Sequence, residues 1–268
     1  MDSIAAVRAF YDENFEHEWE RMDRHPIEWH VNLHFIKQYV QRGDKVLDIG
    51  GGPGRYSIEL SSMGCDMTLV DLSQGNVDFA ANAAREKGVS LTAVRANACD
   101  LSMFEDDSFD HVLLMGPLYH LLEDADREQA IREAVRCLKP GGKLFAHFIS
   151  QYAGLLYAMA RDPASILYPE EQEYFDLIRK DKPFSGHAFT QAYFIRHDDI
   201  PELMGRFPLE PLHFFGSEAM LALCEENIKL QPQEVIDAWC ELAVRFCEDE
   251  HMRRLSEHLM YIGRKEMI

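Results

Sequence analysis

A glycine-rich run is the part of this sequence most able to bind a ligand. It reads Val-Leu-Asp-Ile-Gly-Gly-Gly-Pro-Gly over residues 46–54, so that an apolar stretch leads into it and a helix-forming stretch follows. Glycine lets the backbone turn sharply and lets a ligand lie directly against it. The candidate ligand-binding residues of this run are Asp48, Gly50, Gly51, Gly52 and Gly54.

The spacing of these glycines separates two kinds of nucleotide site. A dinucleotide-binding turn follows the pattern G-x-G-x-x-G/A. Counted from Gly50 or from Gly52, the last position falls on Arg55 or Ser57, so this pattern fails. A nicotinamide-dependent oxidoreductase is therefore disfavoured. The run fits D-x-G-x-G-x-G instead, beginning at Asp48.

Two residues further along could take part in proton transfer. His120 has an ordinary pKa near 6.5 and can act as a general base, and Tyr119 precedes it directly. A structural role for this histidine is the alternative interpretation. His30 and His34 lie four residues apart on a predicted helix, a spacing that can hold a metal. Since no third ligand accompanies them, we expect no metal.

Alternating strands and helices must position these residues. Apolar runs predict strands over residues 45–49, 67–71, 91–96, 110–115 and 143–149. Helical stretches predicted over 55–63, 74–87 and 127–138 separate them. Strands separated by single helices imply a parallel sheet with right-handed crossovers. Such sheets bind ligands at their carboxyl edge, which is where the glycine run would lie.

The flanking segments complete the expected architecture. Residues 1–42 read as helices, because Tyr11, Phe15, Trp19 and Met22 share one helical face. Residues 150–207 interrupt the strand–helix rhythm and read as an inserted helical cap. We therefore expect an α/β fold with a doubly wound, mostly parallel, seven-stranded Rossmann-like sheet. Its core would comprise residues 43–149 and 208–268.

The glycine run resembles motif I of the class I S-adenosylmethionine-dependent methyltransferases. Four further landmarks follow in that family's order: an acidic residue after the second strand, a loop over residues 96–101, a motif IV over 109–120, and a turn over 138–144. The resemblance implies S-adenosyl-L-methionine as the cofactor. The additional cofactor-binding residues that it implies are Asp71, Leu72, Asn97, Ala98, Met115 and Tyr11.

Each of these residues has a chemical reason for its place. The carboxylate of Asp71 can accept two hydrogen bonds from ribose hydroxyls. The family usually has Asp where this chain has Asn97, whose carbonyl can still accept from the amine of adenine. Asp100 or a backbone group is the alternative acceptor. The backbone at Met115 would border the methionine part of the cofactor, and Tyr11 lies on the helix that folds over it.

The implied reaction is an in-line displacement in which a nucleophile attacks a methyl group on a sulfonium. The enzyme must align the two reactants and exclude water. Amino-methyltransferases that act on nucleic-acid bases often have Asn or Asp and then Pro-Pro-Tyr or Pro-Pro-Phe in motif IV. This chain has Met-Gly-Pro-Leu-Tyr over 115–119. That difference and the enclosing cap favour a small-molecule methyl acceptor.

Composition restricts the partners. The formal net charge is -19, and phosphate backbones repel such a surface, so we expect no nucleic acid. No apolar run approaches the roughly 20 residues of a membrane span, and we expect no signal peptide at the beginning of the sequence.

Six cysteines without a CxxC pair favour a reduced, cytoplasmic protein. The alternatives are a non-catalytic cofactor-binding protein and a methyltransferase acting on protein or RNA. The oligomeric state stays open.

Overall fold

The computed structural model describes residues 3–267 and builds one mixed sheet from nine strands within that range. The strands are β1 (Lys45–Ile49), β2 (Asp66–Asp71), β3 (Thr92–Arg95), β4 (Phe109–Leu114), β5 (Leu138–Ser150), β6 (Phe184–His187), β7 (Gln191–Ile195), β8 (Leu209–Gly216) and β9 (His258–Lys265).

Seven of these strands make the main sheet, in the order β3-β2-β1-β4-β5-β9-β8. Strands β1 to β5 pair in parallel, whereas β9 runs antiparallel to both β5 and β8. The predicted doubly wound, mostly parallel sheet is thereby confirmed. A hairpin of β6 and β7 joins the end of β5 through Ile149 and Ser150, so the sheet is two strands larger than the sequence suggests.

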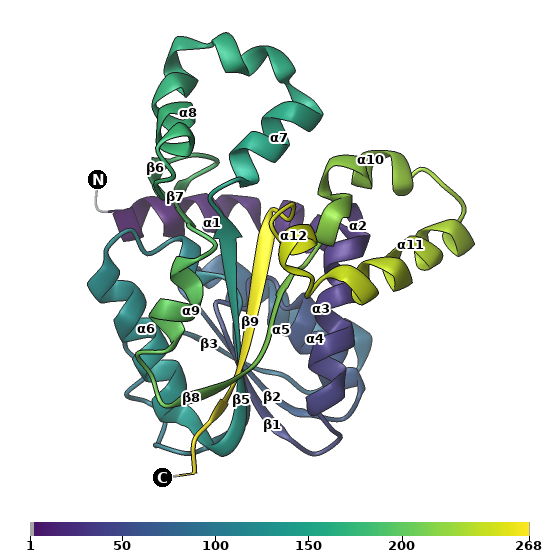
Figure 1. The fold of residues 1–268 in the computed structure, drawn as a ribbon. Helices are drawn as coiled ribbons and strands as arrows, with labels where there is room; N and C mark the ends of the chain where they lie inside the picture. The colour runs from purple at the N-terminus through teal and green to yellow at the C-terminus, as the bar shows by residue number, and fades with distance from the viewer. Residues whose placement is uncertain (1–2, 268) are drawn as a thin grey trace.

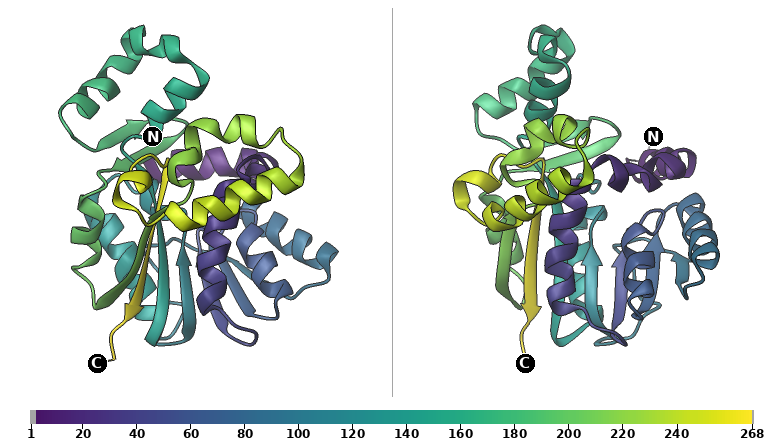
Figure 2. Two further views of the ribbon diagram at one scale, coloured as in Figure 1. Left: turned by 45° about the vertical axis from the view of Figure 1, so that its right-hand side comes forward. Right: turned by 90° about the vertical axis from the view of Figure 1, so that its right-hand side faces the viewer.

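Helices cover both faces of the sheet (Figures 1 and 2). On one face α3 (Pro26–Tyr39), α4 (Arg55–Ser62) and α11 (Gln233–Phe246) contribute buried side chains such as Phe35 and Leu60. On the other face α6 (Asp124–Cys137) and α9 (Asp199–Met204) contribute Ile131 and Ile200. The remaining helices are α1 (Ser3–Trp19), α2 (Arg21–Arg24), α5 (Gln74–Lys87), η1 (Pro117–Tyr119), α7 (Ala153–Arg161), η2 (Pro163–Leu167), η3 (Pro169–Glu171), α8 (Gln172–Arg179), η4 (Ala219–Cys224), α10 (Glu225–Ile228) and α12 (Glu250–Arg253).

Helix α5 shows why the local sequence predicts these elements well. The Ser73 hydroxyl caps its first turn by accepting a hydrogen bond from the backbone N–H of Asn76. Gly88 ends it in the left-handed conformation, with φ of 70°. Side-chain caps of this kind satisfy backbone groups that the helix itself leaves unpaired. Both ends of the helix therefore fall where the sequence places them.

Helix α1 lies across the carboxyl edge of the sheet (Figures 1 and 2). Asp12 anchors it to the beginning of α5, since its carboxylate accepts from the Ser73 hydroxyl at 2.6 Å and from the Gly75 N–H at 3.3 Å. A non-helical residue, Asn14, interrupts the helix after this anchor. The N-terminal segment therefore covers the edge at which parallel sheets bind ligands.

The segment expected to be a cap rises beyond that edge (Figure 1). Helices α7 and α8 lie where helices are predicted, but the sequence analysis did not foresee the hairpin of β6 and β7. Its Lys-Pro and Ser-Gly pairs are typical of loops, whereas Phe184 packs against Tyr174 and Phe194 in a small apolar cluster. Helix α9 packs into the main core instead. Where the cap begins and ends stays a prediction.

Candidate active site

The glycine run forms a tight loop between β1 and α4. Gly50, Gly52 and Gly54 all have positive φ, between 56° and 89°, a region that residues with a Cβ atom rarely adopt. A Cβ atom on Gly50 would come within 2.5 Å of Pro117, whereas one on Gly52 would meet nothing within 4 Å. The loop is therefore packed tightly against Pro117 at Gly50 and faces open space at Gly52.

Asp48 supports this loop from within. It is buried, and its carboxylate accepts a hydrogen bond from the Ser57 hydroxyl at 2.7 Å. A Cβ atom on Gly51 would lie 2.7 Å from the same carboxylate. Burial raises the pKa of Asp48 to about 7, although the bond from Ser57 opposes that rise. These contacts fit a residue that shapes the loop.

Asp71 lies next to the loop, at the end of β2. Its Oδ2 accepts from the Gly52 N–H at 2.9 Å, and its Oδ1 accepts from the Ser73 N–H and from the Asn76 side-chain amide. Burial raises the pKa of Asp71, and these three donors oppose the rise. An ionised carboxylate offers about four acceptor positions. One position thus remains, so two ribose hydroxyls would have to share acceptor sites with a protein donor.

The loop after β3 holds the predicted adenine-side residues. Oδ1 of Asn97 accepts from the Cys99 N–H at 3.0 Å, which stabilises the turn and occupies part of the carbonyl's capacity. Asp100 is exposed, and its carboxylate accepts from the Ser102 N–H. Asn97 is partly buried. The Leu72 carbonyl accepts from Arg95.

The backbone of motif IV packs directly against the backbone of the glycine loop. A Cβ atom on Gly116 would lie 2.9 Å from the carbonyl oxygen of Gly50, so two segments far apart in the sequence require glycine where they touch. The Tyr119 hydroxyl donates to the Met115 carbonyl at 3.3 Å. Burial raises the pKa of Tyr119. The turn thus carries Tyr119 and His120 beside the loop.

His120 connects three segments. Its Nδ1 lies 2.9 Å from the Gln191 carbonyl of β7, which can only accept, so Nδ1 carries the ring proton. Its Nε2 therefore accepts from the Tyr11 hydroxyl of α1, at 2.7 Å. Burial lowers the pKa of His120 to about 4, which keeps the ring neutral at pH 7. Burial also raises the pKa of Tyr11, and Tyr119 adds to the rise.

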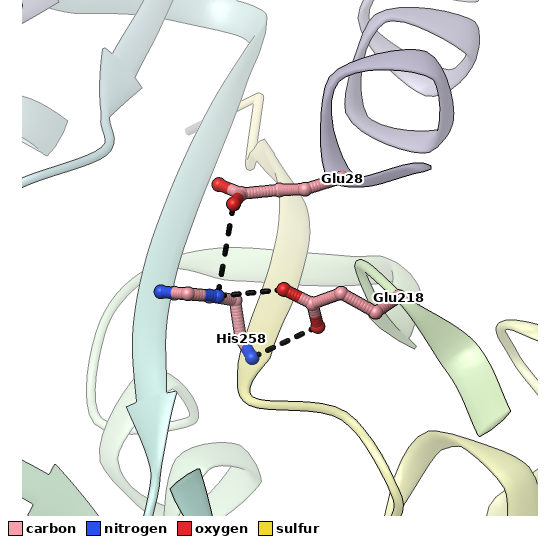
Figure 3. A group of neighbouring side chains, drawn as sticks. All are labelled: Glu28, Glu218 and His258. Atoms are coloured by element: carbon pink, nitrogen blue, oxygen red, sulfur yellow. Dashed lines mark hydrogen bonds and ion pairs between the residues drawn. The ribbon is translucent and has the colours of Figure 1, made fainter. Parts of the chain in front are cut away.

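A buried charged network lies farther along the carboxyl edge (Figure 3). Glu28 forms a two-pronged ion pair with Arg21, at 3.1 and 2.7 Å. Glu218 accepts from the His258 ring at 2.6 Å and from the His258 backbone N–H at 3.1 Å. The His258 Nδ1 lies 3.7 Å from Glu28. We call these four residues the Arg21–His258 network.

The charges of this network balance one another. Burial raises the pKa of Glu28, but Arg21 and His258 outweigh it and hold that pKa well below its ordinary value. Burial lowers the pKa of His258, but Glu28 and Glu218 outweigh it and raise that pKa to about 9. Two carboxylates and an imidazole are a set that can bind a divalent cation. Here the Arg21 guanidinium and the His258 ring already bond to the carboxylates, and Arg21 also lies 3.1 Å from Nε2 of His258.

Sequence reasoning missed several residues at this edge. It did not foresee that Arg21 pairs with buried Glu28. It also missed Asp12, Glu218 and His258. Each lies in a different element, and no local pattern marks one as the partner of another. Contacts between distant segments are the only signal that reveals them.

The comparisons with known proteins agree with this geometry. A family model described as "Methyltransferase domain" matches residues 46–142. A ubiquinone biosynthesis O-methyltransferase of Xanthomonas euvesicatoria is 34% identical over 178 residues, covering 65% of this chain and 72% of that protein. The chain belongs to the class I S-adenosylmethionine-dependent methyltransferases. The predicted family and enzyme class are thereby confirmed.

Other relatives of this methyltransferase differ in their acceptors. The tRNA 5-carboxymethoxyuridine methyltransferase of Escherichia coli is 26% identical over 226 residues, covering 82% of this chain and 80% of that protein. The fold is similar to that of the Burkholderia thailandensis 1,6-didemethyltoxoflavin-N1-methyltransferase, solved with its acceptor and S-adenosylhomocysteine. That likeness has a TM-score of 0.58 and 15% identity and covers 98% of this chain and 88% of that chain.

The site's residues fit the cofactor of this family. A Cβ atom on Gly52 would meet nothing within 4 Å, and the buried Asp71 carboxylate next to Gly52 keeps one acceptor position. A carboxylate beside an uncrowded glycine loop is a donor-and-acceptor set suited to a ribose-bearing ligand. Among residues 3–267, none of the helices has the length and apolar character that crossing a membrane requires.

Proposed function

We propose that this methyltransferase binds S-adenosyl-L-methionine over the carboxyl ends of β1 and β2. The contact between the glycine loop and the Asp71 carboxylate carries the proposal, because it places a hydroxyl-binding group beside an open backbone cradle. When bound, the cofactor supplies a methyl group on a positively charged sulfur. The residues assigned to it are Asp48, Gly50, Gly51, Gly52, Gly54, Tyr11, Asp71, Leu72, Asn97, Ala98 and Met115.

The acceptor assigned to this enzyme is a small molecule held beneath residues 150–207. The net charge of -19 supports this choice against RNA, since phosphates are repelled by acidic surfaces. The relatives include enzymes named for ubiquinone biosynthesis and for tRNA. The RNA acceptor is therefore the second candidate, and the tRNA enzyme among the relatives is the observation that favours it.

His120 and Tyr119 are the residues we assign to the acceptor side. His120 is neutral and fixed in one tautomer by the Gln191 carbonyl, so its Nε2 can accept a hydrogen bond. Tyr11 donates to that nitrogen, and its hydroxyl oxygen can accept in turn from an acceptor group. Tyr119 lines the same turn and orients the acceptor.

Calorimetric titration with S-adenosylhomocysteine tests the cofactor site. We expect micromolar binding by the wild-type protein and at least tenfold weaker binding by Asp71→Ala. The matched control is Asp66→Ala, which removes an exposed carboxylate at the opposite end of the same strand and should change nothing. If folded wild-type protein does not bind S-adenosylhomocysteine, the proposed cofactor site is wrong.

The acceptor class is tested by incubating the enzyme with methyl-labelled cofactor and two separate pools. One pool is bulk tRNA, and the other is a protein-free, RNA-free extract of small metabolites. Labelled product in the small-molecule pool supports the proposal. Labelled product in tRNA alone would instead identify RNA as the acceptor. Binding of S-adenosylhomocysteine with no label in either pool would favour a non-catalytic role.

A further inference from the structure

A second buried histidine, His147, lies three residues before the end of β5 and is 2% exposed. Its Nε2 lies 3.1 Å from the Ser217 hydroxyl, which donates its only proton to Oδ1 of Asn32 at 2.8 Å. The Asn32 amide nitrogen donates to the Tyr56 hydroxyl at 3.1 Å. With the Ser217 proton directed to Oδ1 of Asn32, Nε2 of His147 is the donor in its contact with Ser217.

The other ring nitrogen is left with its lone pair. Nδ1 of His147 has no hydrogen-bond partner among residues 3–267. His120 differs, because both of its ring nitrogens are occupied, by Gln191 and by Tyr11. His147 is therefore the buried histidine at this edge that can still accept a hydrogen bond from a ligand.

Its position matches the place an acceptor must occupy. The cofactor residues follow β1 and β2, so the acceptor has to approach over β4, β5 and β9. His147 lies on β5, with its ring 6.5 Å from that of Tyr119 in motif IV. On its other side it stacks on His258, at 5.2 Å and 5° between the ring planes. It thus lies between the motif IV turn and the Arg21–His258 network.

The surrounding charges keep this ring neutral. Burial lowers the pKa of His147 to about 3, and Glu28 opposes that change, while His258 and Arg21 add to it. These groups come from the N-terminal helices and β9, and Tyr119 and Ser217 complete the surroundings without charge. A neutral ring whose second nitrogen is held by Ser217 presents one fixed acceptor atom.

We propose that Nδ1 of His147 accepts a hydrogen bond from the O–H or N–H group of the methyl acceptor. The enzyme would then select hydroxyl or amine acceptors over carbon centres or thioethers, which have no proton to donate. This inference rests on the proposed function, because it deepens the acceptor side of the same site.

Nitrogen NMR of the protein with labelled histidine tests the tautomer. We expect His147 to carry its proton on Nε2 and His120 to carry its proton on Nδ1, both neutral at pH 7. The resonances are assigned by their loss in His147→Phe and His120→Phe. Ser217→Ala, which removes the partner of Nε2 together with the hydrogen bond to Asn32, should abolish the single tautomer of His147. Protonation of His147 at Nδ1 in the wild-type protein would overturn the proposal.

Phenol and anisole then test acceptor recognition, because they differ in the hydroxyl proton. With S-adenosylhomocysteine bound, phenol should shift the Nδ1 resonance of His147, and anisole should not. His147→Phe should weaken phenol binding about tenfold, as expected for one lost hydrogen bond. The control His111→Phe alters a buried histidine at the beginning of β4. It should not weaken phenol binding.

The two proposals fail in different ways. Loss of S-adenosylhomocysteine binding by the wild-type protein contradicts the proposed function. Retained binding of that ligand, together with an unshifted His147 resonance in phenol, contradicts only the role of His147. Should His147→Phe not fold, the wild-type spectra and Ser217→Ala still decide the matter, because neither needs that variant.

Discussion

The glycines of the loop have different physical tasks even though they belong to one motif. Gly50 is required by contact, because Pro117 and Gly116 of motif IV press against it. Gly52 is required by its backbone conformation and by the open space above it. A substitution at Gly50 therefore disturbs packing between two motifs, whereas one at Gly52 enters the space assigned to the cofactor.

Alanine at these two positions should separate stability from binding. A left-handed backbone costs either variant roughly 1–2 kcal/mol. Gly50→Ala should lose roughly a further 1–3 kcal/mol through overpacking against Pro117. Gly52→Ala should stay folded but bind S-adenosylhomocysteine more weakly. Urea unfolding and calorimetry measure the two effects, and equal losses of stability in both variants would contradict this assignment.

At the scale of elements, helix α1 is fastened at two points that control access to the site. Asp12 bonds to the beginning of α5, and Tyr11 bonds to His120, which in turn bonds to β7. Phe10 of the same helix packs against Phe189 at the tip of the hairpin. The helix and the hairpin therefore close over the edge together, with His120 between them.

Tyr11→Phe should loosen this closure. Losing one partly buried hydrogen bond of roughly 1–1.5 kcal/mol should accelerate release of S-adenosylhomocysteine about tenfold, measured by stopped-flow displacement. The control Tyr157→Phe alters an exposed tyrosine on α7 and should have no effect. An unchanged release rate in Tyr11→Phe would show that α1 is held mainly at Asp12.

The same contact predicts a pH dependence. The pKa of His120 is lowered to about 4 in the closed structure, below its ordinary value of about 6.5. Its contribution to closure is thus fully present above pH 6.5 and is lost as the pH falls through 4. Release should accelerate from pH 7 to pH 4.5, and the difference between wild type and Tyr11→Phe should shrink. A constant difference would count against this account.

At the scale of the whole molecule, the Arg21–His258 network joins the two ends of the chain. Arg21 and Glu28 come from the N-terminal helices, Glu218 follows β8, and His258 begins β9. Removing one partner from a buried set of charges leaves another uncompensated, which typically costs 3–5 kcal/mol. The network therefore ties the N-terminal segment to the far side of the sheet.

His258 should make stability fall in alkaline solution. Its pKa is raised to about 9, so its contribution is fully present below pH 6.5 and is lost as the pH rises through 9. On the order of 2–3 kcal/mol should disappear between pH 6.5 and 9.5. Urea titrations should show this slope in wild type and in His251→Gln, an exposed control, but not in His258→Gln.

Metal removal offers a separate check on the network. Because Arg21 and His258 already neutralise Glu28 and Glu218, we expect EDTA and added Mn²⁺ to leave the thermal midpoint unchanged. A rise in the thermal midpoint with Mn²⁺ that is absent in Glu218→Gln would instead identify Glu28, Glu218 and His258 as a cation site.

The sequence by itself determined the family and the central sheet of this protein. The glycine spacing, the strand ends at Ile49 and Asp71, and the caps of α5 are local features whose physical causes lie within a few residues. Such features can be predicted from the sequence because backbone conformation and helix capping depend on neighbouring residues in the chain. The family and the mostly parallel sheet followed from them.

Only the tertiary structure decided the acceptor side. The partners of His120 lie 109 and 71 positions away in the chain, and Ser217 lies 70 positions from His147. Burial, tautomer and charge balance are set by groups that only folding brings within a few ångströms, so no local pattern could assign them. For the same reason, the sequence did not reveal the hairpin in which Phe184 and Phe194 lie opposite each other on β6 and β7.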